Sequence, residues 1–186
     1  MRSFEQFHLP GNWKVIRLLR NAEFFYGYRT TSIQNATIDK DDSSRAGGVA
    51  DAAWSFDKDS FLNFQVRAGG ITGTRGIDVI EDFNLGGFLS LSGLRTNQLT
   101  GNYMAFGRMV GYHQIATLPV IGRAVYVGAS LEAGNTWRNS SAVSLIDMYT
   151  AGSVFVAADT WLGPFYVAYG LASGGQRSFY LYLGRL

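Results

Sequence analysis

The residues of this chain that could do chemistry are few and poorly spaced for catalysis. The string nearest to a G-x-S-x-G nucleophile motif is GASLEAG (128–134), which lacks the second glycine at the required spacing. His8 and His113 have no metal-ligand partner at helical or hairpin spacing, and the acidic IDKDD (38–42) lacks the glycine and terminal glutamate of an EF-hand loop. The chain has no cysteine, which excludes thiol catalysis. We therefore expect no enzyme, no cofactor and no metal site.

One acidic residue interrupts an otherwise apolar pattern. In the run 123–134 every second residue from Val125 is apolar, and Glu132 falls in the other series with Tyr126 and Ser130. Such alternation predicts a strand with two different faces. An unpaired charge on an enclosed face is costly, so we expect Glu132 to have a partner.

The elements that must position Glu132 are strands throughout. Eight segments show strand patterns: 22–34, 46–56, 60–71, 99–115, 123–135, 149–159, 164–172 and 177–186. Each is near or above the ~9–11 residues that a tilted strand needs to cross a bilayer. The register of 99–115 is ambiguous, which leaves Arg108 without an assigned face.

Composition indicates the environment of these strands. Charged residues make up 16% of the chain and hydrophobic ones 47%, whereas soluble domains carry roughly 25% charge. The chain has no run of ~18 apolar residues that could form a transmembrane helix, and a membrane protein without such helices must close a barrel. The sequence thus predicts an all-β, transmembrane antiparallel β-barrel with eight strands; a soluble β-sandwich or lipocalin-like barrel is the alternative. The net charge of +2 is too small to imply nucleic acid.

The connections between the predicted strands alternate in length. Segments 57–59, 116–122 and 160–163 are short, whereas 35–45, 72–98 and 136–148 are long. Bacterial barrels have short periplasmic turns and longer outside loops. The pattern predicts an outer-membrane protein with Leu186 on the periplasmic side, and only the short SGGQ (173–176) breaks it.

The N-terminal 21 residues differ from the rest. WKVIRLLR (13–20) mixes basic and apolar residues and follows a break at Pro10 and Gly11. A short amphipathic helix on the membrane surface or inside the barrel fits this pattern, with an extra strand as the rival. We therefore expect two parts, an N-terminal amphipathic segment (1–21) and an eight-stranded barrel domain (22–186).

Three strings resemble the C-terminal barrel of the bacterial surface-antigen superfamily, which includes the outer-membrane protein assembly factors. They are FNLGGFLSLSGLRTNQLTGN (83–102), VYVGASLEAGNTW (125–137) and DTWLGPFYVAYGLASGGQRSFYLYLGRL (159–186). The resemblance is greatest to the barrel of patatin-like phospholipase autotransporters. That superfamily's barrel has sixteen strands, with a conserved loop between the eleventh and the twelfth. The resemblance implies that this chain corresponds to strands nine to sixteen, half of such a barrel.

The resemblance also implies a site. It places an inward-folded loop at 72–98 and its tip at four residues: Leu91, Ser92, Gly93 and Leu94. The superfamily writes this tip as Arg-Gly-aromatic, and the strand facing it as F-x-D-x-G, with Glu132 at the acidic position. We expect Glu132 to hold the loop through Arg95, Arg75 or backbone N–H groups near Gly93.

Two functions follow from the resemblance. The first is translocation, insertion or lipid handling across a bacterial outer membrane by a barrel without periplasmic domains. The alternative is a membrane anchor or display barrel, as in a patatin-like autotransporter. Expected partners are the lipid bilayer, lipopolysaccharide and, during biogenesis, the barrel assembly machinery, with no nucleic acid.

A homodimer is also expected. An eight-stranded barrel has an interior only wide enough for side chains, which leaves no room for an inward loop and an N-terminal segment. Two copies on a two-fold axis would join strand 22–34 of one to 177–186 of the other, with Phe25 and Leu181 at the seam. A closed monomer is the alternative.

Overall fold

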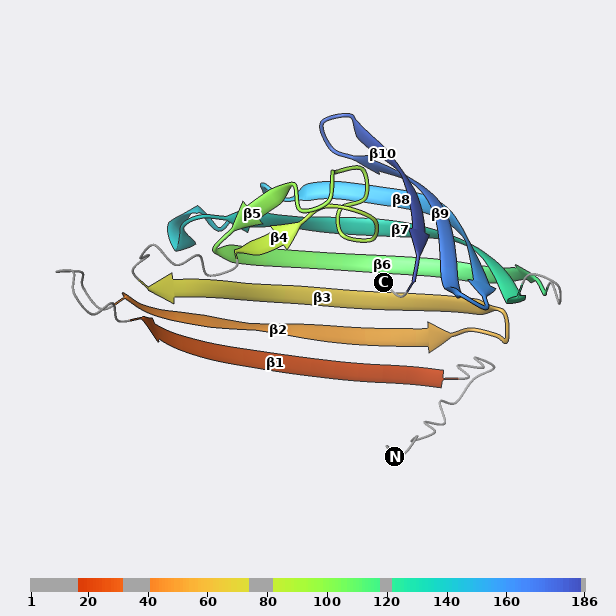
Figure 1. Cartoon of the computed structure of the whole chain (residues 1–186), viewed down its shortest axis with the longest axis horizontal. Helices are drawn as coiled ribbons and strands as arrows, with labels where there is room; N and C mark the ends of the chain where they lie inside the picture. The colour runs from red at the N-terminus through yellow and green to blue at the C-terminus, as the bar shows by residue number, and fades with distance from the viewer. Residues whose placement is uncertain (1–16, 32–40, 74–81, 118–121, 185–186) are drawn as a thin grey trace.

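The computed structural model describes residues 17–31, 41–73, 82–117 and 122–184, and the chain is all-β (Figure 1). Eight long strands form one antiparallel sheet in the order β1-β2-β3-β6-β7-β8-β9-β10. Their bounds are β1 Arg17–Thr31, β2 Asp41–Ser55, β3 Ser60–Gly73, β6 Tyr103–Ala116, β7 Gly122–Trp137, β8 Tyr149–Thr160, β9 Gly163–Ala172 and β10 Gln176–Leu183. Between β3 and β6 lies a two-stranded ribbon of β4 (Phe83–Leu85) and β5 (Leu99–Gly101), and a 3-10 turn, η1 (Ser140–Ala142), follows β7. In this described part of the chain, no helix has the length and apolar character needed to span a membrane.

The large sheet is open and curved. Among the described strands, β1 pairs only with β2, and β10 pairs only with β9, so the sheet has two free edges. Figure 1 shows a trough with β1 along one side and with β9 and β10 curling over at the other. The β4–β5 ribbon lies against β6 and β7. We call the face that carries this ribbon the inner face, and the opposite face the outer face.

The prediction of eight antiparallel strands is confirmed, but several bounds differ: β1 and β2 begin at Arg17 and Asp41 rather than at residues 22 and 46, and β6 begins later than predicted. The predicted strand 99–115 is interrupted at Asn102, which separates β5 from β6. The interruption is fixed by contacts, since the Asn102 carbonyl accepts a hydrogen bond from the Ile71 N–H (2.8 Å) and its side-chain amide donates to the Arg138 carbonyl (3.0 Å). Leu99–Gly101 therefore pairs with β4, and the long sheet strand begins only at Tyr103.

The predicted N-terminal helix is not seen. Residues 13–16 lie outside the described residues, but Arg17–Arg20, the second half of the predicted helix, are the first residues of β1. They pair in register with Ala52–Ser55 of β2. Pairing with β2 satisfies the backbone groups on one side of this stretch, and this long-range pairing overrides a local helical pattern. These four residues are therefore neither part of a helix nor a separate extra strand: they extend the first predicted strand, which begins at Arg17 rather than at residue 22.

The outer face is apolar and exposed. Alternate residues of the strands contribute large apolar side chains that remain between 38% and 68% accessible: Phe64, Val66, Met109, Val127, Leu131, Val154, Val156, Leu171, Phe179 and Leu181. A contiguous exposed apolar surface of this kind marks a site that meets another apolar phase or partner.

The buried core lies on the inner face, between the sheet and the ribbon with its loop. One cluster joins Leu85, Leu91 and Leu94 of the loop region to Phe106 of β6. A second cluster packs Leu89 against residues of β6, β8 and β9. The loop thus takes the place of the second layer that a single sheet needs in order to bury one of its faces.

Candidate functional site

The candidate site is the loop between β4 and β5, residues 86–98, where it lies on the inner face. The loop has an unusual backbone at its tip and just before it. Leu89 (φ 57°) and Leu91 (φ 71°) are both in the left-handed region that residues with a side chain rarely adopt. Leu91 is fully buried and Leu89 is 7% exposed. Such conformations cost of order 1–3 kcal/mol each and persist only where the surroundings fix them. The contacts described next come from four strands of the sheet.

Glu132 of β7 caps the loop tip. It is 4% exposed, and one carboxylate oxygen accepts from the backbone N–H groups of Leu91 (2.5 Å) and Ser92 (2.8 Å). The other oxygen accepts from the hydroxyls of Ser92 (2.7 Å) and Ser130 (2.5 Å). The four donors fill the four acceptor positions of an ionised carboxylate. The charge is thus buried with its hydrogen bonds satisfied, and the two N–H groups of the tight turn gain an acceptor.

Two arginines hold the two residues that come just before the tip, Leu89 and Ser90. Arg108 of β6 donates to the Leu89 carbonyl (2.9 Å), and Arg67 of β3 donates to the Ser90 hydroxyl (3.2 Å). The Arg67 guanidinium also lies 4.5 Å from the centre of the Phe106 ring, within the range of a cation–π contact. The structure thereby assigns Arg108 to the inner face, which the sequence pattern left open.

Strand β10 holds the other side of the tip. The Tyr180 hydroxyl accepts from the Gly93 N–H (3.0 Å) and donates to the Leu94 carbonyl (2.9 Å), while the Ser178 hydroxyl donates to the Gly93 carbonyl (3.0 Å). The loop therefore bridges β3, β6 and β7 on one side to β10 on the other. We call the five side chains that hold residues 89–94 the loop clamp: Arg67, Arg108, Glu132, Ser178 and Tyr180. Ser130 supports the clamp through its hydrogen bond to Glu132.

Two glycines allow the loop to touch the sheet backbone. A Cβ at Gly93, where φ is +106°, would lie 2.5 Å from the Ala172 nitrogen and the Leu171 carbonyl carbon. A Cβ at Gly170 would lie 2.7 Å from the Gly93 nitrogen. Only glycine at both positions permits this close approach of two backbones, so the loop tip sits directly on β9.

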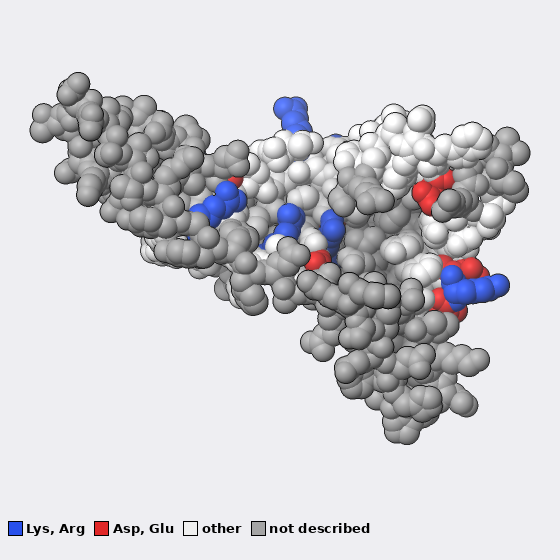
Figure 2. All heavy atoms as spheres, turned by 60° about the horizontal axis from the view of Figure 1, so that its bottom comes forward, with Lys and Arg blue, Asp and Glu red and all other residues white. Residues whose placement is uncertain are grey.

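Charged and polar residues form a row across the inner face at the level of the clamp. The register aligns Asp51 of β2, Gln65 of β3, Arg108 and Glu132 on adjacent strands, and the Gln65 amide donates to Asp51 (2.6 Å). Figure 2 shows basic side chains in the hollowed part of the molecule, with an acidic group beside two of them. The inner face thus combines charges of both signs, in contrast to the apolar outer face.

The predicted site residues fall into three groups. Leu91, Ser92, Gly93 and Leu94 are buried on the inner face and meet Glu132 or Tyr180. Arg95, proposed as a partner of Glu132, is exposed, and its backbone N–H donates to the Gln98 side chain (2.8 Å). Arg75 lies outside the described residues. Of the three partners considered for Glu132, backbone N–H groups of the loop are the ones in contact with it.

The proposed seam residues lie on the two edge strands, Phe25 in β1 and Leu181 in β10. Leu181 is 68% exposed and belongs to the outer face. Phe25 is opposite Gly47, which is opposite Gly69. A Cβ at Gly69 would point at the ring of Phe83 in the ribbon, so this row belongs to the inner face. The position of Phe25 is therefore in the inner-face series of its strand, whereas Leu181 is in the outer-face series.

Sequence reasoning missed Arg67, Tyr180 and Ser178 as loop partners. Tyr180 and Ser178 alternate with the apolar Phe179 and Leu181, which could have placed both on the inner face as polar groups facing a loop. Arg67 alternates along its strand with the polar residues Asn63 and Gln65. Nothing in the sequence connects these residues to Ser90.

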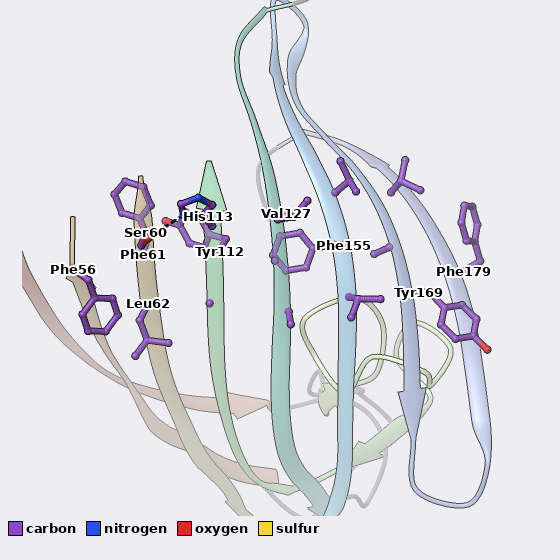
Figure 3. Close-up of a pocket in the computed structure, with 17 residues that line it drawn as sticks. Phe56, Ser60, Phe61, Leu62, Tyr112, His113, Val127, Phe155, Tyr169 and Phe179 are labelled. Carbon is purple, nitrogen blue, oxygen red and sulfur yellow. Dashed lines mark hydrogen bonds between the residues drawn. The ribbon is translucent and has the colours of Figure 1, made fainter. Parts of the chain in front are cut away.

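The hydrogen bonds of Glu132 suit a role in holding the loop. Every polar atom of the Glu132 carboxylate is bound to the loop or to Ser130, so it is not placed to act as a general base. In the described ranges, no group of three or more histidine, aspartate or glutamate side chains is arranged to hold a metal. An open hollow of about 810 Å³ is lined mainly by apolar residues of β3 and β6–β10 (Figure 3). Its Ser60 and His113 side chains hydrogen bond to each other at 3.0 Å.

Comparison with known proteins adds no family assignment. No protein-family model matches the chain, and no curated protein sequence matches it.

Proposed function

We propose that this chain is the wall of an outer-membrane β-barrel of the assembly and secretion superfamily, acting in translocation, insertion or lipid handling. The observation that carries the proposal is the inverted pattern of the sheet. Its exposed outer face is apolar, whereas its enclosed inner face holds Glu132, Arg108 and Arg67. A soluble sheet would present the opposite arrangement, but a barrel wall facing lipid outside and a polar lumen inside is built this way.

The clamped loop suits a barrel that moves material or rearranges. A loop that lies in the lumen narrows it, and its side-chain contacts with β10 couple the lumen to the strand at the sheet edge. The alternative function is an anchor or display barrel for another domain. It draws support from the same fold, which would serve equally as a tether, and a conductance measurement separates the two.

We propose that two copies complete the barrel. In lipid, the unpaired N–H and C=O groups of a free strand edge are very unfavourable, and the described sheet has two such edges, β1 and β10. A two-fold axis lets β1 of each copy pair with β10 of the other, which removes both edges with one kind of contact. The resulting ring has sixteen strands and a lumen wide enough for the inner loops.

A disulfide crosslink tests this seam. For the seam between two copies we propose the register in which Thr31, at the end of β1, lies opposite Gln176, at the start of β10. In that antiparallel register Tyr26 lies opposite Leu181. Tyr26 pairs with Ala46, which is exposed in the outer series, so both positions fall on the outer face. Tyr26→Cys combined with Leu181→Cys should give a dimer on a denaturing gel. Phe25→Cys with Leu181→Cys is the control, because these positions fall on opposite faces and should crosslink poorly. A crosslink within one chain would show a closed monomer.

Function is tested with purified protein in planar bilayers and in vesicles that carry a fluorescent lipid. We expect ion conductance or lipid scrambling above that of empty membranes, and an increase in either when the loop is released by Glu132→Ala. Membrane-inserted protein that is silent in both assays, with and without that substitution, would leave the anchor as the function.

A further inference from the structure

A cluster of aromatic rings lies on the inner face, toward the end of the sheet where β2 turns into β3. The register places Phe61, Tyr112 and Tyr180 in one row across the sheet, together with Ser55, next to that turn. We call the following residues the aromatic floor: Phe61, Phe88, Tyr112, Tyr126, Tyr166 and Tyr180. All but Phe88, which comes from the clamped loop, lie on the long strands.

The rings of the aromatic floor form two groups of touching rings that differ in orientation, and both groups pack against the buried cluster around Val110 and Phe155. Phe61 and Tyr112 stack with centroids 5.2 Å apart, and Tyr112 meets Tyr126 edge-on at 5.8 Å. Phe88 lies 5.8 Å from Tyr166 and 5.6 Å from Tyr180. The contacts hold the rings in place, so a ligand would meet surfaces that are already ordered.

The floor is not a sealed core. All six residues are only partly buried. The hydroxyls of Tyr112, Tyr126 and Tyr166 make no hydrogen bond to any residue that the structure describes, whereas the Tyr180 hydroxyl is taken up by the loop. The floor therefore offers ring faces and three unused hydroxyls, and none of its members carries a charge.

We propose that the aromatic floor binds an uncharged saccharide. A pyranose ring presents a C–H face that packs on an aromatic ring, and hydroxyls at its edge that hydrogen bond to tyrosine. A lipid acyl chain would cover the three hydroxyls without giving them a partner, which is unfavourable. An isolated phosphate would find no cation among the six residues. Of these three ligand classes, the saccharide is the one that suits both the rings and the hydroxyls.

Two sources present this chemistry to such a protein. One is the N-acetyl amino sugar chain of a cell wall, and the other is the saccharide part of an outer-membrane glycolipid. The choice of these two sources rests on the outer-membrane location in the proposed function. The binding itself goes beyond that function, because it does not depend on transport or on dimer formation.

The test is a calorimetric titration of the protein folded in a detergent with no sugar headgroup. Chitohexaose represents the cell-wall chain, a delipidated neutral O-polysaccharide represents the glycolipid, and decanoate and inorganic phosphate are the competing ligand classes. We expect one of the two saccharides to bind and to identify the source, and dodecyl maltoside to compete because its headgroup is itself a disaccharide. Binding of neither saccharide, or displacement of a bound saccharide by decanoate, would overturn the proposal.

Substitutions assign the binding to the floor. Tyr126→Ala should weaken saccharide binding about fivefold through loss of a ring contact. Tyr126→Phe keeps the ring and the fold, and should weaken binding about threefold through loss of the hydroxyl. Tyr169→Phe on the outer face is the matched control and should bind as the parent does. Equal binding by the parent and both Tyr126 variants would place the sugar elsewhere and contradict the proposal.

Discussion

Gln65 and Val66 are neighbours in β3, and they show how the two faces of the sheet differ. Gln65 is half-buried on the inner face, where its amide donates to Asp51. Val66 is 41% exposed on the outer face, and the apolar side chains around it are exposed as well. The same alternation of buried or half-buried with exposed residues repeats along β7, β8 and β10. The comparison teaches that the surroundings of each face, rather than the β propensity of single residues, determine which residue types that face carries.

The inner face itself differs between its two halves. From β6 to β10 it is covered by the clamped loop, and Phe106, Val110 and Phe155 are buried there. On β2 and β3 the corresponding residues are mostly half-buried. The trough closes over most strongly at β9 and β10 (Figure 1), which is where Tyr180 and Ser178 bind the loop. We infer that the loop draws β10 inward, so the curvature of the sheet depends on the clamp.

Removal of the Glu132 side chain should have the largest effect on this half. Glu132→Ala leaves the buried N–H groups of Leu91 and Ser92 without an acceptor, which should cost about 4 kcal/mol of unfolding free energy. Trypsin should then cut after Arg95 in the loop. Glu132→Gln keeps one carbonyl acceptor and should be intermediate, while Asp159→Ala, at an exposed acid, is the control. Unchanged protection of the loop in Glu132→Ala would show that the clamp does not hold it.

A charge on the outer face should have the next largest effect. Val66→Lys places an ammonium group against lipid and should reduce the unfolding free energy in vesicles by about 3 kcal/mol. Gln65→Lys is the neighbouring control on the inner face, where Asp51 is at hand, and should cost less than about 1 kcal/mol. If the outer face met water, both variants would unfold at nearly the same urea concentration as the parent.

The close contact between the loop and β9 offers a third test. Gly93→Ala forces a Cβ into the Ala172 backbone at a positive φ, and should cost about 2 kcal/mol while loosening β10. Gly174→Ala is the control, because Gly174 also has a positive φ (+81°) but has no atom within 4 Å of the added Cβ. The two variants are compared by urea unfolding. An equal loss in both would mean that backbone strain alone matters and that the loop does not rest on β9.

The smallest effect is expected outside both faces, in the turn between β2 and β3. The backbone N–H of Asp59 hydrogen bonds to Asp57 (2.8 Å) and lowers the Asp57 pKa below its ordinary value of 3.8, with further help from Ser60. A lowered pKa stabilises the fold above the unfolded value, and this stability is lost as pH falls through the folded pKa. The small advantage of the parent over Asp57→Asn in urea should thus be present at pH 7 and shrink below pH 4. An advantage as large at pH 3 as at pH 7 would contradict this.

Much of the sheet could be predicted from the sequence, because alternation reports directly which residues share a face. It placed Glu132 opposite Leu131 and located all eight strands. It failed at Arg17–Arg20, where a basic apolar pattern suits a helix and only pairing with β2 decides for a strand. The partner of Glu132 was left open between Arg95, Arg75 and backbone N–H groups near Gly93, and the structure uses the backbone N–H groups of Leu91 and Ser92. Sequence alone could not choose among them, because every residue has a backbone N–H and no pattern marks the one that is used.

The loop backbone was equally out of reach. Gly93 signals a positive φ because glycine adopts it freely, and the resemblance had already placed it at the loop tip. Leu89 and Leu91 adopt positive φ as well, and leucine carries no such signal. Their conformation follows from contacts with β6, β7 and the core, which are set by the folded sheet rather than by the local sequence.

The most direct test of the account is the environment of the outer face. A fluorophore at Leu131→Cys, on β7 next to the inward Glu132, is compared in vesicles with one at Lys58→Cys in the turn. The membrane-wall account predicts strong quenching of the Leu131 label by brominated lipid and weak quenching by iodide, with the reverse at Lys58. Iodide quenching at Leu131 as strong as at Lys58, without quenching by brominated lipid, would show that the outer face meets water and would contradict the account.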